Sequence, residues 1–129
     1  MVVFEKIITV SKDDIDQLNH VNNVKYVKWV NEIAESHWIQ NSNKILRDKF
    51  FWILISHKID YKSECLLGDQ IKIKTYVKSS EGLKSIRIVE FHNLNSDKLA
   101  AISETTWCLM DYNSKKPTRI TDEIKDLFE

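Results

Sequence analysis

The chain has 129 residues, of which 43% are hydrophobic, so we expect one domain with a small core rather than a disordered protein. Lysine plus arginine and aspartate plus glutamate each number 19, and the net charge of zero gives no basic field for binding nucleic acid or an anionic membrane. No apolar run approaches about 18 residues, so no membrane-spanning helix is expected.

The amino terminus and the cysteines bear on where the protein resides. Residues Met1–Lys6 put charge directly after a short apolar run, which does not match a secretory signal peptide. Cys65 and Cys108 form no CxxC pair, and neither has a histidine at metal-ligand spacing. We therefore expect reduced thiols in a cytoplasmic protein and no zinc. The near-neutral charge also favours self-association.

The first predicted element is a strand over Val2–Val10, where residues alternate and many are β-branched. Ser11–Asp14 ends it as a solvated turn, in which Asp14 has a second candidate role in orienting the next loop. The polar-rich stretch Asp14–Asn23 then leads directly into an apolar segment, Val24–Gln40, which predicts a long helix.

The start of this helix is a candidate chemical site. Asp16, Asn19, Asn22 and Asn23 all favour caps and turns. The first N–H groups of a helix lack internal partners and carry partial positive charge, so they can polarise a carbonyl oxygen. An upstream aspartate can then act on the carbon of that carbonyl. The structural alternative is an aspartate that caps the helix and a histidine, His20, that bonds nearby backbone.

The helix is apolar around most of its circumference. Its charged residues Lys25, Lys28, Glu32 and Glu35 are spaced by three and four and form one stripe. A surface helix normally shows the reverse pattern. We therefore predict a largely enclosed helix with a sheet wrapped around it and one strip facing water or a partner.

The rest of the chain predicts four more strands, joined by hairpins. Ile45–Phe50 is either a short helical turn or a loop, and a short helix capped at Thr121 is expected over Ile124–Glu129. His57 is interpreted as a hydrogen-bonded core histidine in a long central strand. Together these elements predict an α+β domain. The four strands are Phe51–Tyr61, Gln70–Ser79, Leu83–Leu94 and Leu99–Tyr112.

The motif Asp16-x-x-Asn19-His20-Val21-Asn22-Asn23-x-x-Tyr26-x-x-Trp29 resembles the signature of the hotdog-fold thioesterases. More narrowly, it is similar to the 4-hydroxybenzoyl-CoA thioesterase-like acyl-CoA thioesterases and to the acyl-ACP thioesterases. Asn19 stands where the first group commonly has glycine, a mild exchange because asparagine tolerates a left-handed backbone. Leu18 stands where these relatives often carry asparagine, so that residue is not carried over. Further similarity lies at Ile59-Asp60-Tyr61, Glu64-Cys65, Gly68-Asp69, Thr75 and Trp107.

The resemblance implies a hotdog fold, in which a mostly antiparallel five-stranded sheet wraps a long central helix. It implies a homo-oligomer, dimer or tetramer, with sheets paired edge to edge and sites at the subunit interface. It also implies hydrolysis of a fatty acyl thioester, with acyl-CoA favoured over acyl-ACP and without metal or organic cofactor. Asp16 would be general base or nucleophile, the Asn22 and Asn23 N–H groups would polarise the carbonyl, and His20 and Glu64 would orient the reacting groups.

The resemblance also suggests residues that would contact the substrate. Tyr26, Val27 and the aromatic run Phe50–Trp52 would line the acyl chain, or else are plain core. Lys84 and Arg87 would meet phosphates, or else are solvated strand residues. A non-catalytic hotdog subunit that binds an acyl group is the alternative function.

Overall fold

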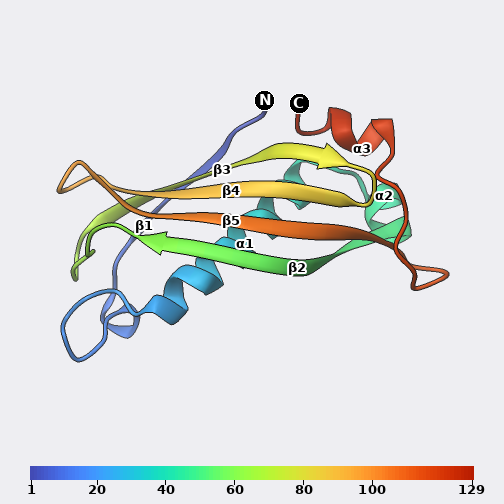
Figure 1. Ribbon diagram of the computed structural model, residues 1–129. Helices are drawn as coiled ribbons and strands as arrows, with labels where there is room; N and C mark the ends of the chain where they lie inside the picture. The colour runs from blue at the N-terminus through green and yellow to red at the C-terminus, as the bar shows by residue number, and fades with distance from the viewer.

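The computed structural model describes residues 1–129 and consists of one antiparallel sheet with a long helix across one face (Figure 1). The strand order is β1-β3-β4-β5-β2, and every neighbouring pair is antiparallel. This confirms the predicted α+β architecture of five strands and one long helix. The strands are β1 (Phe4–Thr9), β2 (Phe50–Tyr61), β3 (Gln70–Glu81), β4 (Lys84–Asn93) and β5 (Lys98–Asp111). The helices are η1 (Lys12–Asp14), α1 (Asn23–Asn41), α2 (Lys44–Lys49) and α3 (Asp122–Asp126).

Side-chain caps fix where the helices begin. Asn22 accepts a hydrogen bond from the Val24 amide at the start of α1, and Asn43 does the same for the Leu46 amide in α2. Thr121 caps α3, as the sequence predicts, but the helix covers Asp122–Asp126 and not the predicted Ile124–Glu129. The segment with two readings, Ile45–Phe50, is mostly the helix α2.

The main core lies between α1 and the sheet. Twelve buried residues form it, with Tyr26, Val30 and Ile33 from α1 packed against side chains such as Ile73 and Phe91 from the strands. A smaller cluster closes the other end of the molecule, where α2 and α3 meet β5. Its members are Leu46, Leu109, Ile120 and Ile124.

Two expectations about β2 are wrong. The strand is not central, because it pairs only with β5 and forms one edge of the sheet. It is not joined to β3 by a hairpin either, since β4 and β5 lie between these two strands. The apolar run resembles a central strand, yet Ile53 and Ile55 are 41% and 51% exposed. A bulge between Leu54 and Ser56 interrupts the pairing with β5.

The prediction of an enclosed α1 is also wrong for the single chain. The sheet covers one face of the helix, and Val24, Val27 and Ile39 on other faces are 71%, 37% and 49% exposed. One sheet of this size cannot surround a helix, so apolar surface remains open along α1 and along the β2 edge.

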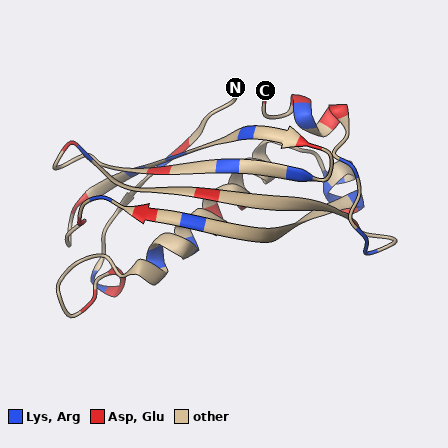
Figure 2. Ribbon diagram, in the orientation of Figure 1, with Lys and Arg blue, Asp and Glu red and all other residues tan.

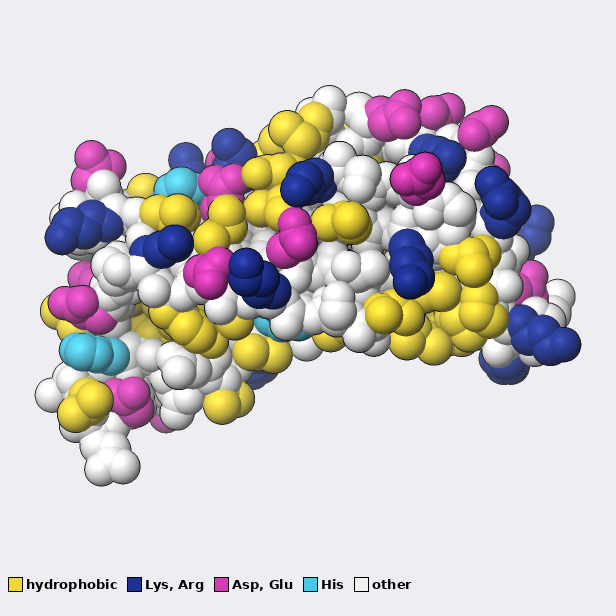
Figure 3. Space-filling view, viewed as in Figure 1, with side chains coloured by type: hydrophobic (Ala, Val, Ile, Leu, Met, Phe, Trp, Pro, Cys, Tyr) yellow, Lys and Arg dark blue, Asp and Glu magenta, His cyan; other side chains and the backbone are white.

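The charged residues are distributed over the visible face of the sheet with both signs interspersed (Figure 2). Hydrophobic side chains lie between them on the same face, with a larger group towards the end of the molecule where β2 begins (Figure 3). No helix is both long and apolar enough to cross a lipid bilayer.

Candidate active site

The residues before α1 fold back on themselves into a tight loop. The Asp16 amide donates to the His20 carbonyl oxygen at 2.8 Å, and Ile15 pairs with Val21. Asn19, inside the loop, has a φ of 61°, in the left-handed region. Asparagine tolerates this conformation, as glycine does, so Asn19 fits the position where the resemblance expects glycine.

Loop amides hold one oxygen of the Asp16 carboxylate. Oδ1 accepts from the amides of Leu18 at 2.9 Å and His20 at 3.3 Å, whereas Oδ2 has no hydrogen-bond partner in the chain. The residue is half-buried. Oδ1 therefore has the structural role of holding the loop. Oδ2 is left to accept a proton or to attack a carbon.

The two proposed oxyanion donors at the helix start differ. The Asn22 amide already donates to the Asp14 carbonyl oxygen at 2.8 Å, so the expectation that it polarises a substrate carbonyl is corrected. The Asn23 amide has no acceptor within the chain and lies at the positive end of α1. Asp14 also holds Lys25 at 3.5 Å, which agrees with its candidate role in orienting the loop.

Glu64 lies in the segment that runs beside this loop. The Val21 amide donates to the Cys65 carbonyl oxygen at 2.9 Å, and His20 forms an isolated bridge with Leu66. Glu64 is exposed. Its neighbour Cys65 is buried, and burial raises the pKa of that thiol, which leaves it protonated at neutral pH.

Tyr26 and Val27, the two candidates for an acyl wall on α1, lie in different surroundings. Tyr26 is 3% exposed and packs edge-on against Tyr61 and Phe91. Burial raises the pKa of its phenol, so it stays neutral. Tyr26 is therefore a core residue beneath the helix start, and Val27 lies on the open side of α1.

Lys84 and Arg87, the two candidates for a phosphate contact, also lie in different surroundings. Lys84 is exposed at the start of β4, where a phosphate contact is open to it. Arg87 is 6% exposed and faces α1, where its Nη1 lies 2.9 Å from His37 Nδ1 and 3.0 Å from Thr75 Oγ1. The alternative that Arg87 is a solvated strand residue is therefore wrong. Arg87 faces α1 because Val89 and Phe91, which point to the same side of β4, are fully buried in the core.

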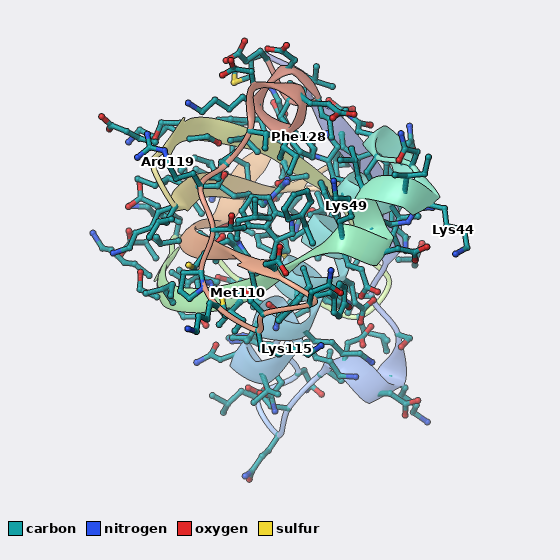
Figure 4. The ribbon with its side chains drawn as sticks, turned by 90° about the vertical axis from the view of Figure 1, so that its right-hand side faces the viewer. Lys44, Lys49, Met110, Lys115, Arg119 and Phe128 are labelled. Carbon is teal, nitrogen blue, oxygen red and sulfur yellow. The ribbon has the colours of Figure 1, made fainter.

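A cavity of about 590 Å³ lies between the second half of α1, the start of β2 and the inner side of the sheet. Its size suits a small-molecule site. The aromatic run Phe50–Trp52 is part of its wall. Figure 4 looks onto this end of the molecule, where Phe128 lies beneath α3. Sequence reasoning missed most of the other lining residues, among them Trp38, Arg47, Trp107 and Phe128, because they are distant from one another in the chain.

The cavity and the Asp16 loop lie at opposite ends of α1. From Asn23 to Trp38 the helix rises by about 22 Å at 1.5 Å per residue. Within one chain, the candidate catalytic groups and the cavity are therefore separate.

The prediction that His57 is hydrogen-bonded is confirmed. His57 Nε2 lies 2.8 Å from Ser103 Oγ, and partial burial lowers the pKa of this half-buried ring. The strand position differs from the expectation, since His57 is on the edge strand. No three histidine, cysteine or acidic side chains gather into a group that could hold a metal ion.

A family model gives the family of the chain, and solved structures give its fold. Residues 10–128 match the model of the thioesterase-like superfamily. No curated protein sequence matches the chain. Many solved structures are similar.

Three solved structures illustrate the likeness. Slr0204, a 1,4-dihydroxy-2-naphthoyl-CoA thioesterase from Synechocystis, aligns with a TM-score of 0.82 at 18% identity, covering 98% of this chain and 95% of its own. YbaW, a probable thioesterase from Escherichia coli, aligns with a TM-score of 0.84 at 18% identity, covering 95% of this chain and 94% of its own. SAV2348 from Staphylococcus aureus, solved in complex with CoA, aligns with a TM-score of 0.86 at 15% identity, covering 98% of this chain and 81% of its own. At such identities the likeness establishes the fold.

Proposed function

Because the chain belongs to the thioesterase-like superfamily, we propose that it is a thioester hydrolase that acts on acyl-CoA. The observation that carries the proposal is the pairing of a half-fixed carboxylate with a free helix amide. Asp16 has one oxygen held by the loop and one without a partner, and Asn23 presents an N–H without an acceptor at the start of α1. These are a base or nucleophile and an oxyanion donor, the minimum set for acyl transfer.

The reaction follows from these two groups. Asp16 Oδ2 takes a proton from water as the water oxygen attacks the thioester carbon, and the Asn23 N–H stabilises the developing oxyanion. The carbon–sulfur bond then breaks, and the thiolate leaves and is protonated, giving a free acid and CoA. Direct attack by Asp16, through an anhydride that water then hydrolyses, uses the same geometry. His20 lies in the loop and Glu64 in the segment beside it, and both would orient the water or the thioester.

We propose that the site is completed by a second copy of the chain. β2 runs from the cavity at Phe50 to Tyr61, which packs against Tyr26 near the start of α1. If two β2 strands pair antiparallel, the cavity end of one meets the Asp16 end of the other. A thioester held at one Asp16 loop would then extend its acyl chain into the partner's cavity. The exposed Ile53 and Ile55 on β2 support this pairing.

The proposed substrate is a fatty acyl thioester of CoA. The apolar walls of the cavity suit an acyl chain, with Phe50–Trp52 as contacts and Val27 on the open side of α1. Lys84 remains the candidate for a CoA phosphate. Two alternatives are acyl-ACP as the carrier and a non-catalytic subunit that only binds the acyl group.

The test is thiol release from acyl-CoAs ranging from acetyl to palmitoyl, plus benzoyl, by the parent protein and by Asp16→Asn. We expect turnover to fall by at least about 100-fold in the variant, because a positioned base typically contributes about 10²–10⁴ in rate. Asp13→Asn is the matched control, since Asp13 is an exposed residue of the neighbouring η1 and should leave turnover unchanged.

The outcomes separate the alternatives. Saturable turnover of acyl-ACP with weak turnover of the same CoA ester would identify the carrier as ACP. If the parent protein hydrolyses neither ester but still binds acyl-CoA, its function is that of a non-catalytic binding subunit.

A further inference from the structure

Arg87 is a buried cation without a nearby anion. It is 6% exposed, and none of the six ion pairs in the chain includes it. Its two hydrogen-bond acceptors, His37 and Thr75, are both neutral. His37 accepts at Nδ1, and burial together with the Arg87 charge lowers the pKa of this imidazole to about 4. Burying a charge without an opposite charge is costly, so the position calls for a reason.

The guanidinium has donors left for a ligand. Arginine carries five N–H donors, and both hydrogen bonds of Arg87 use Nη1. No fully enclosed side-chain nitrogen in the chain lacks a partner, so Nε and Nη2 are in contact with open space. Arg87 is one of the residues that line the 590 Å³ cavity.

Arg87 also belongs to a polar row on the helix-facing side of the sheet. The register sets it opposite Thr105 on β5, and Thr105 opposite His57 on β2. Directly opposed residues point to the same side of a sheet, and Arg87 contacts His37 of α1. A surface made only to pack on a helix would be apolar, as it is at Phe91 beneath the start of α1.

The charges on the cavity wall favour an anion. The lining has two guanidinium groups, those of Arg87 and Arg47, and one carboxylate, that of Glu35. Glu35 is exposed and makes no ion pair with either. The other walls are mainly aromatic, including Trp38 and Trp52, which meet edge to face.

We propose that the cavity receives a fatty acyl chain that ends in a carboxylate, and that Arg87 pairs with this carboxylate. The inference rests on the proposed thioester hydrolysis and names its substrate class, the monothioesters of dicarboxylic acids. The aromatic walls contact the methylene chain, and the guanidinium fork matches the two carboxylate oxygens. Arg87 selects the substrate and takes no part in the bond-breaking step.

The test compares octanoyl-CoA with suberyl-CoA, which has the same chain length and a terminal carboxylate. The parent should favour suberyl-CoA in kcat/KM. In Arg87→Met the ratio of the two values should fall by about 30-fold, equivalent to about 2 kcal/mol, the scale of one charge-assisted hydrogen bond. Methionine is chosen because apolar residues of similar volume often replace buried ions without loss of stability.

Two further variants bracket this result. Arg87→Lys keeps the charge but loses the fork, so its preference should lie between those of the parent and Arg87→Met. Arg119→Met removes an exposed arginine at the same end of the molecule (Figure 4) and should leave the ratio unchanged. Circular dichroism and thermal unfolding check that each variant folds. If Arg87→Met does not fold, the parent preference and Arg87→Lys decide.

Calorimetric titration with free suberate and with CoA gives a readout without turnover. Suberate binding should be lost in Arg87→Met, and CoA binding should persist. A parent that prefers octanoyl-CoA, with suberate binding unaffected by Arg87→Met, overturns the inference and leaves the thioesterase intact. Absence of turnover on every thioester overturns the proposed function instead. In that case, loss of suberate binding in Arg87→Met would still support the cavity assignment, and its retention would overturn it.

Discussion

At the scale of single residues, Arg87 shows that the sequence does not reveal which side of a strand a residue occupies. Its side chain contacts His37 of α1. The sequence alternation around Arg87 is compatible with either face of β4, since Ile86 and Ile88 on one side are as apolar as Val89 and Phe91 on the other. Only the packing of Val89 and Phe91 against α1 decides the face, and so Arg87 enters the core. By contrast, Asp16 and Asn19 could be predicted, because a tight loop before a helix needs these residue types locally.

His37 makes the stability of the protein depend on pH. Burial, followed by the charge of Arg87, lowers the pKa of this histidine from 6.5 to about 4. Between these values the unfolded chain binds a proton that the folded chain does not, so the free energy of unfolding should fall as the pH drops from 6.5 to about 4. The loss should reach about 3 kcal/mol at 1.36 kcal/mol per pKa unit, and above pH 6.5 the contribution is complete.

Denaturant unfolding at several pH values measures this dependence. His37→Gln removes the titrating group, so the difference between parent and variant isolates it from carboxylates that titrate in the same range. An equal slope in both proteins between pH 4 and 6.5 would contradict the assignment.

At the scale of elements, the extent of α1 could be predicted closely, whereas its surroundings could not. The cap at Asn22 and the apolar periodicity are local signals, and they give the bounds of α1. Whether an apolar face meets the chain's own sheet or a partner is not a local property. The same holds for β2, whose apolar run predicts burial without saying by which chain.

Asn22 should stabilise α1 by more than its neighbour does. Its Oδ1 accepts from the Val24 amide at 3.0 Å, so Asn22→Ala should lower the free energy of unfolding by about 1 kcal/mol. Asn23→Ala is the matched control, because the Asn23 side chain makes no hydrogen bond and alanine has the higher helix propensity. Urea titration measures both, and similar losses in the two variants would show that the cap contributes little.

At the scale of the whole molecule, the β2 edge is where self-association should be sensitive to mutation. Ile55 is 51% exposed at the bulge of β2, and a lysine there would put a charge into a paired edge. Ile55→Lys should shift the protein to monomer in a sizing column, and thioester turnover should fall with it. Ile7→Lys, at a 54% exposed residue on the opposite edge strand β1, is the control that should retain the β2 pairing. A monomeric Ile55→Lys with full turnover would contradict the shared site.

The strand order also determines when β2 can acquire its neighbour during synthesis. Its only partner within the chain is β5, and Asp111 at the end of β5 follows Tyr61 by 50 residues. At typical translation rates of about 5–20 residues per second, roughly 3–10 s pass before that partner is complete. Throughout this interval an apolar twelve-residue segment has both edges unpaired. We therefore expect the nascent chain to be open to misassembly along β2 until its last strand is complete.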